Sequence, residues 1–415
     1  MRQHVKKLSL GAALLAGVMA FGAAQAKDPI KFAAPLDYTA VYTFLTNEYA
    51  QGQKDYLTMI NDAGGVDGHK IEYASSDTGN QPQRGIEAYN RAQRDGAVLF
   101  DFLSTPVARA MVNRALDDKV VMITALHGRG DASDGETFPY IFPLMSTYWS
   151  QAASLIDYME KHEGGLKGKK VAHVYIDSPF GREPIPVLEK LSEKLDFSLR
   201  TFPYASPGNE QSSTWSEVRR FRPDQVIIWG AGGGQAVSVR EAIRNGIAPE
   251  KIHSVVWLAE ADMEAVGKDT AKGIRKFEAT DSGTGSPLLK EIMEKVIEPG
   301  KGSGPKENVG RTYYNIGVAT MAVSVEAARL ALKEYGPPLD GDKLRKGFEM
   351  VKDFSANGLL PPLTFSNKDH QGGGFGRVAH WDGEKWAPLS DWSNPYQDIV
   401  WESIAHDAAA FKEGR

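Results

Sequence analysis

The sequence contains no cysteine. A chain without cysteine forms no disulfide bond, and it lacks the acylated cysteine that holds some exported proteins on a membrane. After residue 26, no stretch reaches the roughly 18 uninterrupted apolar residues of a membrane-spanning helix. We therefore expect neither a disulfide-stapled scaffold nor a membrane anchor.

Positive charge is scarce as well. The chain has 48 Lys and Arg against 53 Asp and Glu, and three of the positive residues (Arg2, Lys6 and Lys7) lie in the first 26 positions. Without those positions, 45 positive residues face 53 negative ones, which gives a formal net charge of −8. A nucleic-acid partner favours a basic face, so this balance argues against nucleic-acid binding and for solubility.

The first 26 residues have the three parts of a secretory signal. MRQHVKK is a short basic region, LSLGAALLAGVMAFGAA is an apolar stretch of signal length, and Ala24-Gln25-Ala26 is a small-x-small cleavage site. We expect cleavage after Ala26 and a soluble mature protein in a Gram-negative periplasm.

Several catalytic and cofactor motifs are absent. IIWGAGGGQAV (227–237) has the strand, glycine turn and helix of a phosphate cradle, but Gln235 stands where the dinucleotide motif requires Gly or Ala. A carboxylate should follow about 20 residues later, whereas Glu260 lies 30 residues after Gly230. The sequence has no G-x-S-x-G motif and no His pair at i, i+4. We therefore expect no cofactor, no metal and no enzymatic activity.

Strand-like and helix-like segments alternate along the mature chain, whose length of 389 residues (415 minus 26) suits two domains. The first unit has predicted strands at 30–36, 70–77, 97–103 and 120–125, with helices at 46–64, 82–96 and 105–119. The second has strands at 169–177, 225–230 and 253–260, with helices at 146–164, 184–196 and 236–246. A buried helical zone at 309–336 and a hairpin around WDGEKW (381–386) follow. This rhythm predicts an α/β protein with two doubly wound parallel sheets.

Ligands of doubly wound sheets bind outside the carboxyl ends of the strands. This rule selects the loops at 37–39, 104–105, 124–127, 177–181, 230–234 and 260–262. If two such sheets face each other, these loops line one cleft.

INDAGGVDGHKIEYASSDTGNQP (60–82) resembles the signature of type I periplasmic binding proteins of the leucine/isoleucine/valine-binding family. The match continues through LFDFLSTPVARA, VVMITA, VYIDSPFGREP and AVGKDTAKGIRKF, and covers nearly all of the mature chain. The resemblance implies two α/β lobes joined by three hinge crossings, near 143–147, 277–283 and 363–369. Lobe I would comprise 27–144 plus 278–363, and lobe II would comprise 145–277 plus 364–415.

The resemblance also implies ligand-binding residues in lobe I. Family members hold a ligand carboxylate with hydroxyl and amide groups that follow two strands, and Ser104, Thr105 and Thr124 stand at those places. An aromatic residue of the first loop also contacts the ligand, and Tyr42 or Tyr38 corresponds to it.

In lobe II, the family has an aromatic residue before a glycine, and Phe180 corresponds to it. A carboxylate after the last strand binds the ligand ammonium in amino-acid binders. Glu260 corresponds to this carboxylate, with Asp262 as the alternative.

Two loops depart from the family pattern. The second hydroxyl loop reads Ala125-Leu126-His127, and His127 is either a solvated loop residue or a ligand contact. The loop that often carries an aromatic residue reads AGGG. Gly232 and its neighbours either leave room for a ligand and offer backbone N–H groups to it, or simply form a turn.

The function implied by the resemblance is that of a substrate-binding component of an ABC importer, with a branched-chain or related amino acid as ligand. An aromatic carboxylate or a small amide is the alternative ligand. The expected partners are an ABC permease and its ATPase, and the protein would be a monomer. A ligand sensor for a membrane kinase would use the same fold. An exported hydrolase would need a nucleophile, a metal or a matched carboxylate pair, none of which the sequence displays.

Overall fold

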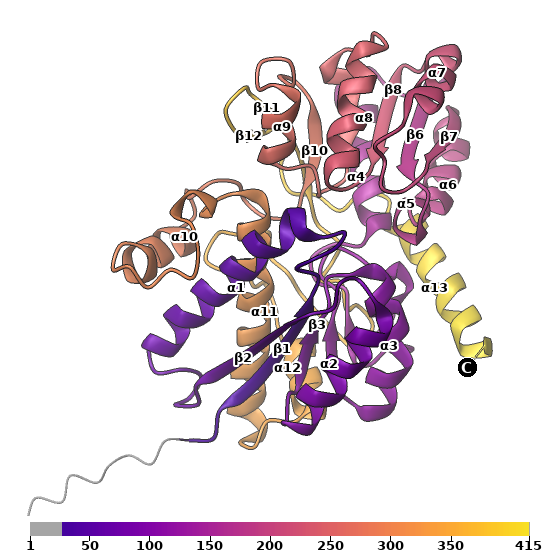
Figure 1. Cartoon of the computed structure of the whole chain (residues 1–415). Helices are drawn as coiled ribbons and strands as arrows, with labels where there is room; N and C mark the ends of the chain where they lie inside the picture. Colours follow the sequence, from indigo (N-terminus) through magenta and orange to yellow (C-terminus); the bar gives the residue numbers. More distant parts are fainter. Residues whose placement is uncertain (1–26, 415) are drawn as a thin grey trace, which may run out of the picture.

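The computed structural model describes residues 27–414. The predicted signal at 1–26 lies outside the described residues. Two separate β-sheets, each flanked by helices, form two lobes (Figure 1). The prediction of two α/β units is therefore confirmed.

The first sheet has five parallel strands in the order β2-β1-β3-β4-β5. Its strands are β1 (Ile30–Leu36), β2 (Ile71–Asp77), β3 (Leu99–Asp101), β4 (Val121–Ile123) and β5 (Ile141–Phe142). Its helices are α1 (Thr43–Asp62), α2 (Pro82–Arg94) and α3 (Thr105–Asp118), with a short 3-10 turn, η1 (Gly130–Ser133), before β5. We call this sheet and its helices, together with a helical segment at 287–349 that returns to them, the first lobe.

The returning segment comprises α10 (Pro287–Ile292), η3 (Met293–Ile297), η4 (Lys306–Asn308), α11 (Thr312–Tyr335) and α12 (Gly341–Glu349). Two glycines let the backbones of α1 and α11 meet: a Cβ on Gly52 would be close to the carbonyl of Tyr314, and one on Gly317 would be close to the carbonyl of Tyr49. By length and hydropathy α11 could cross a membrane, but 83% of its apolar window is buried inside the protein. It is the core helix that the apolar zone at 309–336 predicts.

The second lobe contains a seven-stranded sheet in the order β12-β11-β10-β9-β8-β6-β7. Its strands are β6 (Lys170–Ile176), β7 (Ser198–Tyr204), β8 (Gln225–Trp229), β9 (Ile252–Ser254), β10 (Arg275–Glu278), β11 (Arg377–Trp381) and β12 (Trp386–Pro388). Its helices are α4 (Tyr148–His162), α5 (Pro179–Arg182), α6 (Ile185–Leu195), α7 (Ser212–Phe221), α8 (Gly233–Arg244), η2 (Pro249–Lys251) and α9 (Glu260–Val266). The strands β11 and β12 are antiparallel, with Trp381 opposite Trp386, which confirms the predicted hairpin.

The last helix, α13 (Gln397–Gly414), contacts both lobes (Figure 1). Near its start, Asp398 pairs with Lys194 of the second lobe. Near its end, Phe411 packs against Phe138 of the first lobe, with 4.5 Å between the ring centroids. The sequence analysis did not predict this helix.

Three predicted strands are clearly shorter in the structure, namely those at 97–103, 120–125 and 253–260. The run at 253–260 forms β9 only as far as Ser254, and the chain then turns, since the amide of Leu258 bonds the carbonyl of Val255. Residues 255–259 are buried apolar residues. A short apolar run has the same sequence pattern in a strand and in a buried turn, which is why the pattern misplaced this boundary. Glu260 is consequently the first residue of α9 and does not close a strand.

Candidate functional site

An inner cavity lies between the lobes, at the carboxyl ends of strands from both sheets. Its volume is about 10 Å³, which is room for roughly one water molecule. It is lined by Tyr42, Phe44, Leu45, Leu103, Thr105, His127, Tyr148, Phe180, Ala231 and Trp257. Because these residues come from both lobes, the two lobes are closed on each other here.

A larger groove of about 400 Å³ adjoins the inner cavity and shares five of its residues; we call it the mouth groove. Its first-lobe wall comes from residues 40–44, Asn80, Thr105 and Pro106. Its second-lobe wall comes from Ile176, residues 178–180, Ser206, Pro207, Asn209 and residues 231–234. The cavity and the groove together form a continuous lining between the lobes.

His127 is the most unusual polar residue of the inner cavity. It is buried, and neither ring nitrogen has a hydrogen-bond partner among the described residues. Burial lowers its pKa to about 3, so the imidazole is neutral near pH 7. The hydroxyl of Thr124, three residues earlier in the same loop, is also buried and without a partner. Buried polar atoms are nearly always paired in proteins, so this histidine stands out as a lining residue with unused hydrogen-bonding capacity.

Aromatic rings form most of the remaining wall. Tyr148 is at the first turn of α4, where its hydroxyl accepts a hydrogen bond from the indole N–H of Trp257 at 2.7 Å. The centroids of the Tyr148 and Phe180 rings are 5.1 Å apart. Tyr313 of α11 donates to the carbonyl of Trp257 at 2.7 Å, which ties this wall to the first lobe. The rings of Tyr148 and Tyr313 are therefore held in place by hydrogen bonds to Trp257.

The glycine run after β8 accommodates a residue of the opposite lobe. Gly232 has φ +60° and ψ −150°, a conformation that only glycine adopts readily. A Cβ there would be 2.9 Å from the ring of Phe44 in the first lobe. The missing side chain of Gly232 thus leaves room for the Phe44 ring. Gly232 also directly precedes Gly233, the first residue of α8, at the mouth groove.

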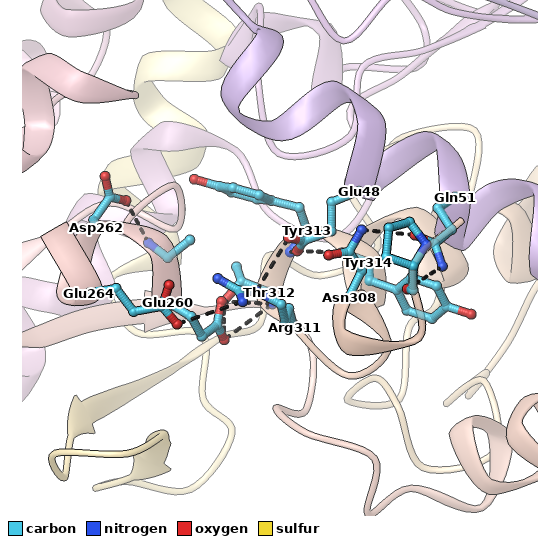
Figure 2. A network of polar contacts seen from close by, with 12 residues as sticks. Glu48, Gln51, Glu260, Asp262, Glu264, Asn308, Arg311, Thr312, Tyr313 and Tyr314 are labelled. Atoms are coloured by element: carbon cyan, nitrogen blue, oxygen red, sulfur yellow. Dashed lines mark hydrogen bonds and ion pairs between the residues drawn. The ribbon is translucent and has the colours of Figure 1, made fainter. Parts of the chain in front are cut away.

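A polar network beside the cavity joins the lobes at the first turn of α11 (Figure 2). From the second lobe, Glu260 accepts hydrogen bonds from the amide of Thr312 at 3.2 Å and from its hydroxyl at 3.0 Å. From α1, Glu48 accepts hydrogen bonds from the amides of Tyr313 at 2.9 Å and Tyr314 at 3.1 Å. Two carboxylates, one from each lobe, thus occupy the free amides of this helix end, where negative charge is stabilised.

Burial and mutual repulsion alter the pKa values of this network. Burial, and next the charge of Glu260, raises the pKa of Glu48 to about 7. Burial also raises the pKa of Asp262 to about 7. The fully buried Lys276 donates to the hydroxyl of Thr312 at 2.7 Å, and its burial lowers its pKa. The network is held together by the buried Lys276, by Arg311, which lies 3.5 Å from Glu48, and by the amides of α11.

The structure brings five of the ten predicted site residues to the cavity or the groove. These are Tyr42, Thr105, His127, Phe180 and Gly232. Thr124 and Ala125 are buried in the loop before His127 and do not line either space.

Three predicted residues are engaged elsewhere. The hydroxyl of Ser104 accepts from the amide of Val107 as the cap of α3. Tyr38 bonds the hydroxyl of Ser75 at 2.8 Å, and Glu260 bonds Thr312, as described above. None of the three lines the cavity or the groove.

Sequence reasoning missed the lining residues Phe44, Leu45, Leu103 and Tyr148, and it included Ala231 only as part of the loop at 230–234. Trp257 lies near the end of the predicted strand at 253–260, and this place is the signal that could find it. Tyr148 and Phe44 lie in the first turns of helices, and their patterns resemble those of ordinary core residues. Among residues 27–414, no group of three or more His, Asp or Glu residues is arranged to hold a metal ion.

Comparison with known proteins gives a consistent match. The family model described as periplasmic binding protein matches residues 29–385. The Leu/Ile/Val-binding protein homolog 3 of Brucella melitensis is 21% identical over 69% of this chain and 77% of its own length.

Solved structures share the fold. A protein of the Pseudomonas fluorescens group, described as an ABC transporter permease, is 34% identical, with a TM-score of 0.86 over 93% of this chain and 97% of its own. A branched-chain amino acid ABC transporter protein of Thermus thermophilus, solved with bound valine, is 18% identical, with a TM-score of 0.78 over 91% of this chain and 98% of its own.

Proposed function

Because the chain belongs to the periplasmic binding protein family, we propose that it is the substrate-binding component of an ABC importer and closes its two lobes over a small organic solute. The observation that carries this proposal is the buried imidazole of His127, which lines a cavity between the lobes and has no partner among the described residues. A ligand group would supply the missing hydrogen bonds.

The names of relatives suggest the first ligands to test. The Brucella melitensis relative and the valine-bound Thermus thermophilus structure make branched-chain and related amino acids the first class. Aromatic carboxylates and small amides form the second class, which the aromatic walls of the inner cavity favour.

The proposal includes the surroundings in which such a protein works. The chain is exported, is cleaved after Ala26 and acts in the periplasm as a monomer without catalytic activity. It delivers its solute to a permease and ATPase in the membrane. N-terminal sequencing of periplasmic material tests the cleavage site, and Lys27 is the first residue expected.

A thermal-shift screen of the mature protein against amino acids, amides and carboxylates tests the proposed function. A ligand at 100 times its dissociation constant adds about 2.7 kcal/mol to the free energy of unfolding. We expect a clear rise of the melting temperature with at least one small solute, and uptake of that solute should be lost when the gene is deleted. The proposal is overturned if no solute in the screen raises the melting temperature.

A further inference from the structure

The lining of the inner cavity and the mouth groove carries no formal charge. Among the described residues that line either space, none is Asp, Glu, Lys or Arg. An ammonium group buried here would lack a carboxylate partner, and an unpaired buried charge is costly. The lining therefore disfavours a ligand that carries an ammonium group.

Carboxylates border this region, but the protein pairs them itself; Asp177, between the lining residues Ile176 and Ser178, pairs with Arg182. Asp37 accepts hydrogen bonds from the amides of Ala40 at 2.8 Å and Tyr42 at 2.9 Å. Glu260 accepts hydrogen bonds from Thr312 across the lobes. Asp37 and Glu260 therefore have most of their roughly four acceptor positions occupied by the protein, which leaves few for a ligand ammonium.

The mouth groove offers donors to an anion instead. The 12-residue helix α8 begins at Gly233, and its capping residue Gly232 provides no side-chain cap. Within the described part of the chain, the amides of Gly233 and Gly234 donate no hydrogen bond. Free amides and the helix dipole make such a helix start favourable for a carboxylate.

The inner cavity supplies the second observation. His127 is buried there with both ring nitrogens unpartnered. A neutral imidazole donates one hydrogen bond and accepts another, so it suits a hydroxyl or carbonyl group. The aromatic walls beside it favour a flat apolar body.

We propose that the ligand is an amine-free carboxylate with a flat apolar body. Its carboxylate binds the first amides of α8, and its body lies in the mouth groove against the rings of Tyr42, Phe44 and Phe180, which line both spaces. A hydroxyl or carbonyl group at its far end bonds His127. This assignment rests on the proposed function and narrows the ligand class of the same site.

Matched pairs of compounds test the assignment by calorimetry on the mature protein. The pairs are tyrosine with 3-(4-hydroxyphenyl)propanoate, and leucine with 4-methylpentanoate. We expect the amine-free member to bind roughly tenfold tighter or more, and the hydroxyphenyl acid to bind best. Tighter binding of tyrosine or leucine overturns the assignment and keeps the receptor role. If none of the four compounds binds, the assignment is also overturned. The receptor role fails as well only if the wider thermal-shift screen is negative.

A proline substitution tests the anion site. Gly233→Pro removes an amide donor at the first helical position, where proline is tolerated. Gly285→Ala is the control, since Gly285 lines neither the cavity nor the groove and a Cβ there has no neighbour within 4 Å. We expect Gly233→Pro to lower the affinity for the hydroxyphenyl acid roughly tenfold but not the affinity for its neutral amide analogue, and Gly285→Ala to leave both affinities unchanged. Unchanged affinity of the folded Gly233→Pro variant for the acid overturns the anion site.

Discussion

The carboxylate of Glu260 in α9 accepts hydrogen bonds from both the amide and the hydroxyl of Thr312 in α11, which belongs to the other lobe (Figure 2). The pair therefore joins the two lobes when they are closed. The family resemblance implies that Glu260 pairs with a ligand ammonium. In this structure its carboxylate bonds Thr312 instead.

Glu260→Gln distinguishes a lobe contact from a ligand contact. A glutamine keeps an oxygen that accepts from Thr312 but loses the charge, so we expect a loss of affinity of about 1 kcal/mol, equal for leucine and 4-methylpentanoate. Calorimetry with both compounds measures the effect. A loss of roughly 2–5 kcal/mol for leucine alone would show that Glu260 pairs with an ammonium.

His127→Phe removes two unpartnered ring nitrogens from a buried position. Because a buried polar group without a partner costs roughly 1–3 kcal/mol, we expect the variant to unfold at a higher temperature than the wild type without ligand. The same change should lower the affinity for 3-(4-hydroxyphenyl)propanoate to the affinity for 3-phenylpropanoate, which lacks the hydroxyl. Thermal unfolding and calorimetry check the two effects. A variant with unchanged discrimination between these acids would remove His127 from the site.

Gly232→Ala tests how the glycine loop acts in closure. The positive φ and the 2.9 Å approach of a Cβ to the Phe44 ring both oppose a side chain here. We expect loss of stability of roughly 1–3 kcal/mol and weaker ligand binding, whereas Gly285→Ala, where a Cβ has no neighbour within 4 Å, should change neither. If the double variant Gly232→Ala, Phe44→Ala binds ligand as weakly as Gly232→Ala alone, backbone strain and not the contact with Phe44 causes the loss of affinity.

Glu48 predicts a specific pH dependence. Burial and then Glu260 raise its pKa to about 7 in the folded protein, from an ordinary value of 4.5. The folded state therefore holds this proton more tightly than the unfolded state, and the stabilisation is lost as the pH rises from about 4.5 to 7. The slope is at most about 1.4 kcal/mol per pH unit. We expect the free energy of unfolding of the wild type to fall relative to Glu48→Gln over this range. Parallel curves for the two proteins would contradict the prediction.

The sequence predicts the two-sheet architecture because strand and helix periodicities reflect burial within each lobe. It also places His127 in a loop that follows a parallel strand, and the structure has this residue in the lining of the inner cavity. The partner of Glu260 is not predictable in this way. Thr312 is 52 residues further along the chain, and only the packing of α11 against the second lobe brings them together. The shape of the cavity depends on the same packing, because Phe44 and Tyr148 have the helical spacing of core residues and only tertiary structure shows which of them face the cleft.

The central claim is that ligand binding closes the two lobes over the site between them. The absence of cysteine allows two introduced cysteines to be labelled uniquely with spin labels. Gln83 in α2 and Glu210 before α7 are exposed residues on opposite lobes, and each is near a residue that lines the mouth groove. Pulsed electron spin resonance on the double variant Gln83→Cys, Glu210→Cys gives the distribution of distances between them. We predict that saturating ligand shortens and narrows this distribution; an identical distribution with and without bound ligand would contradict the account.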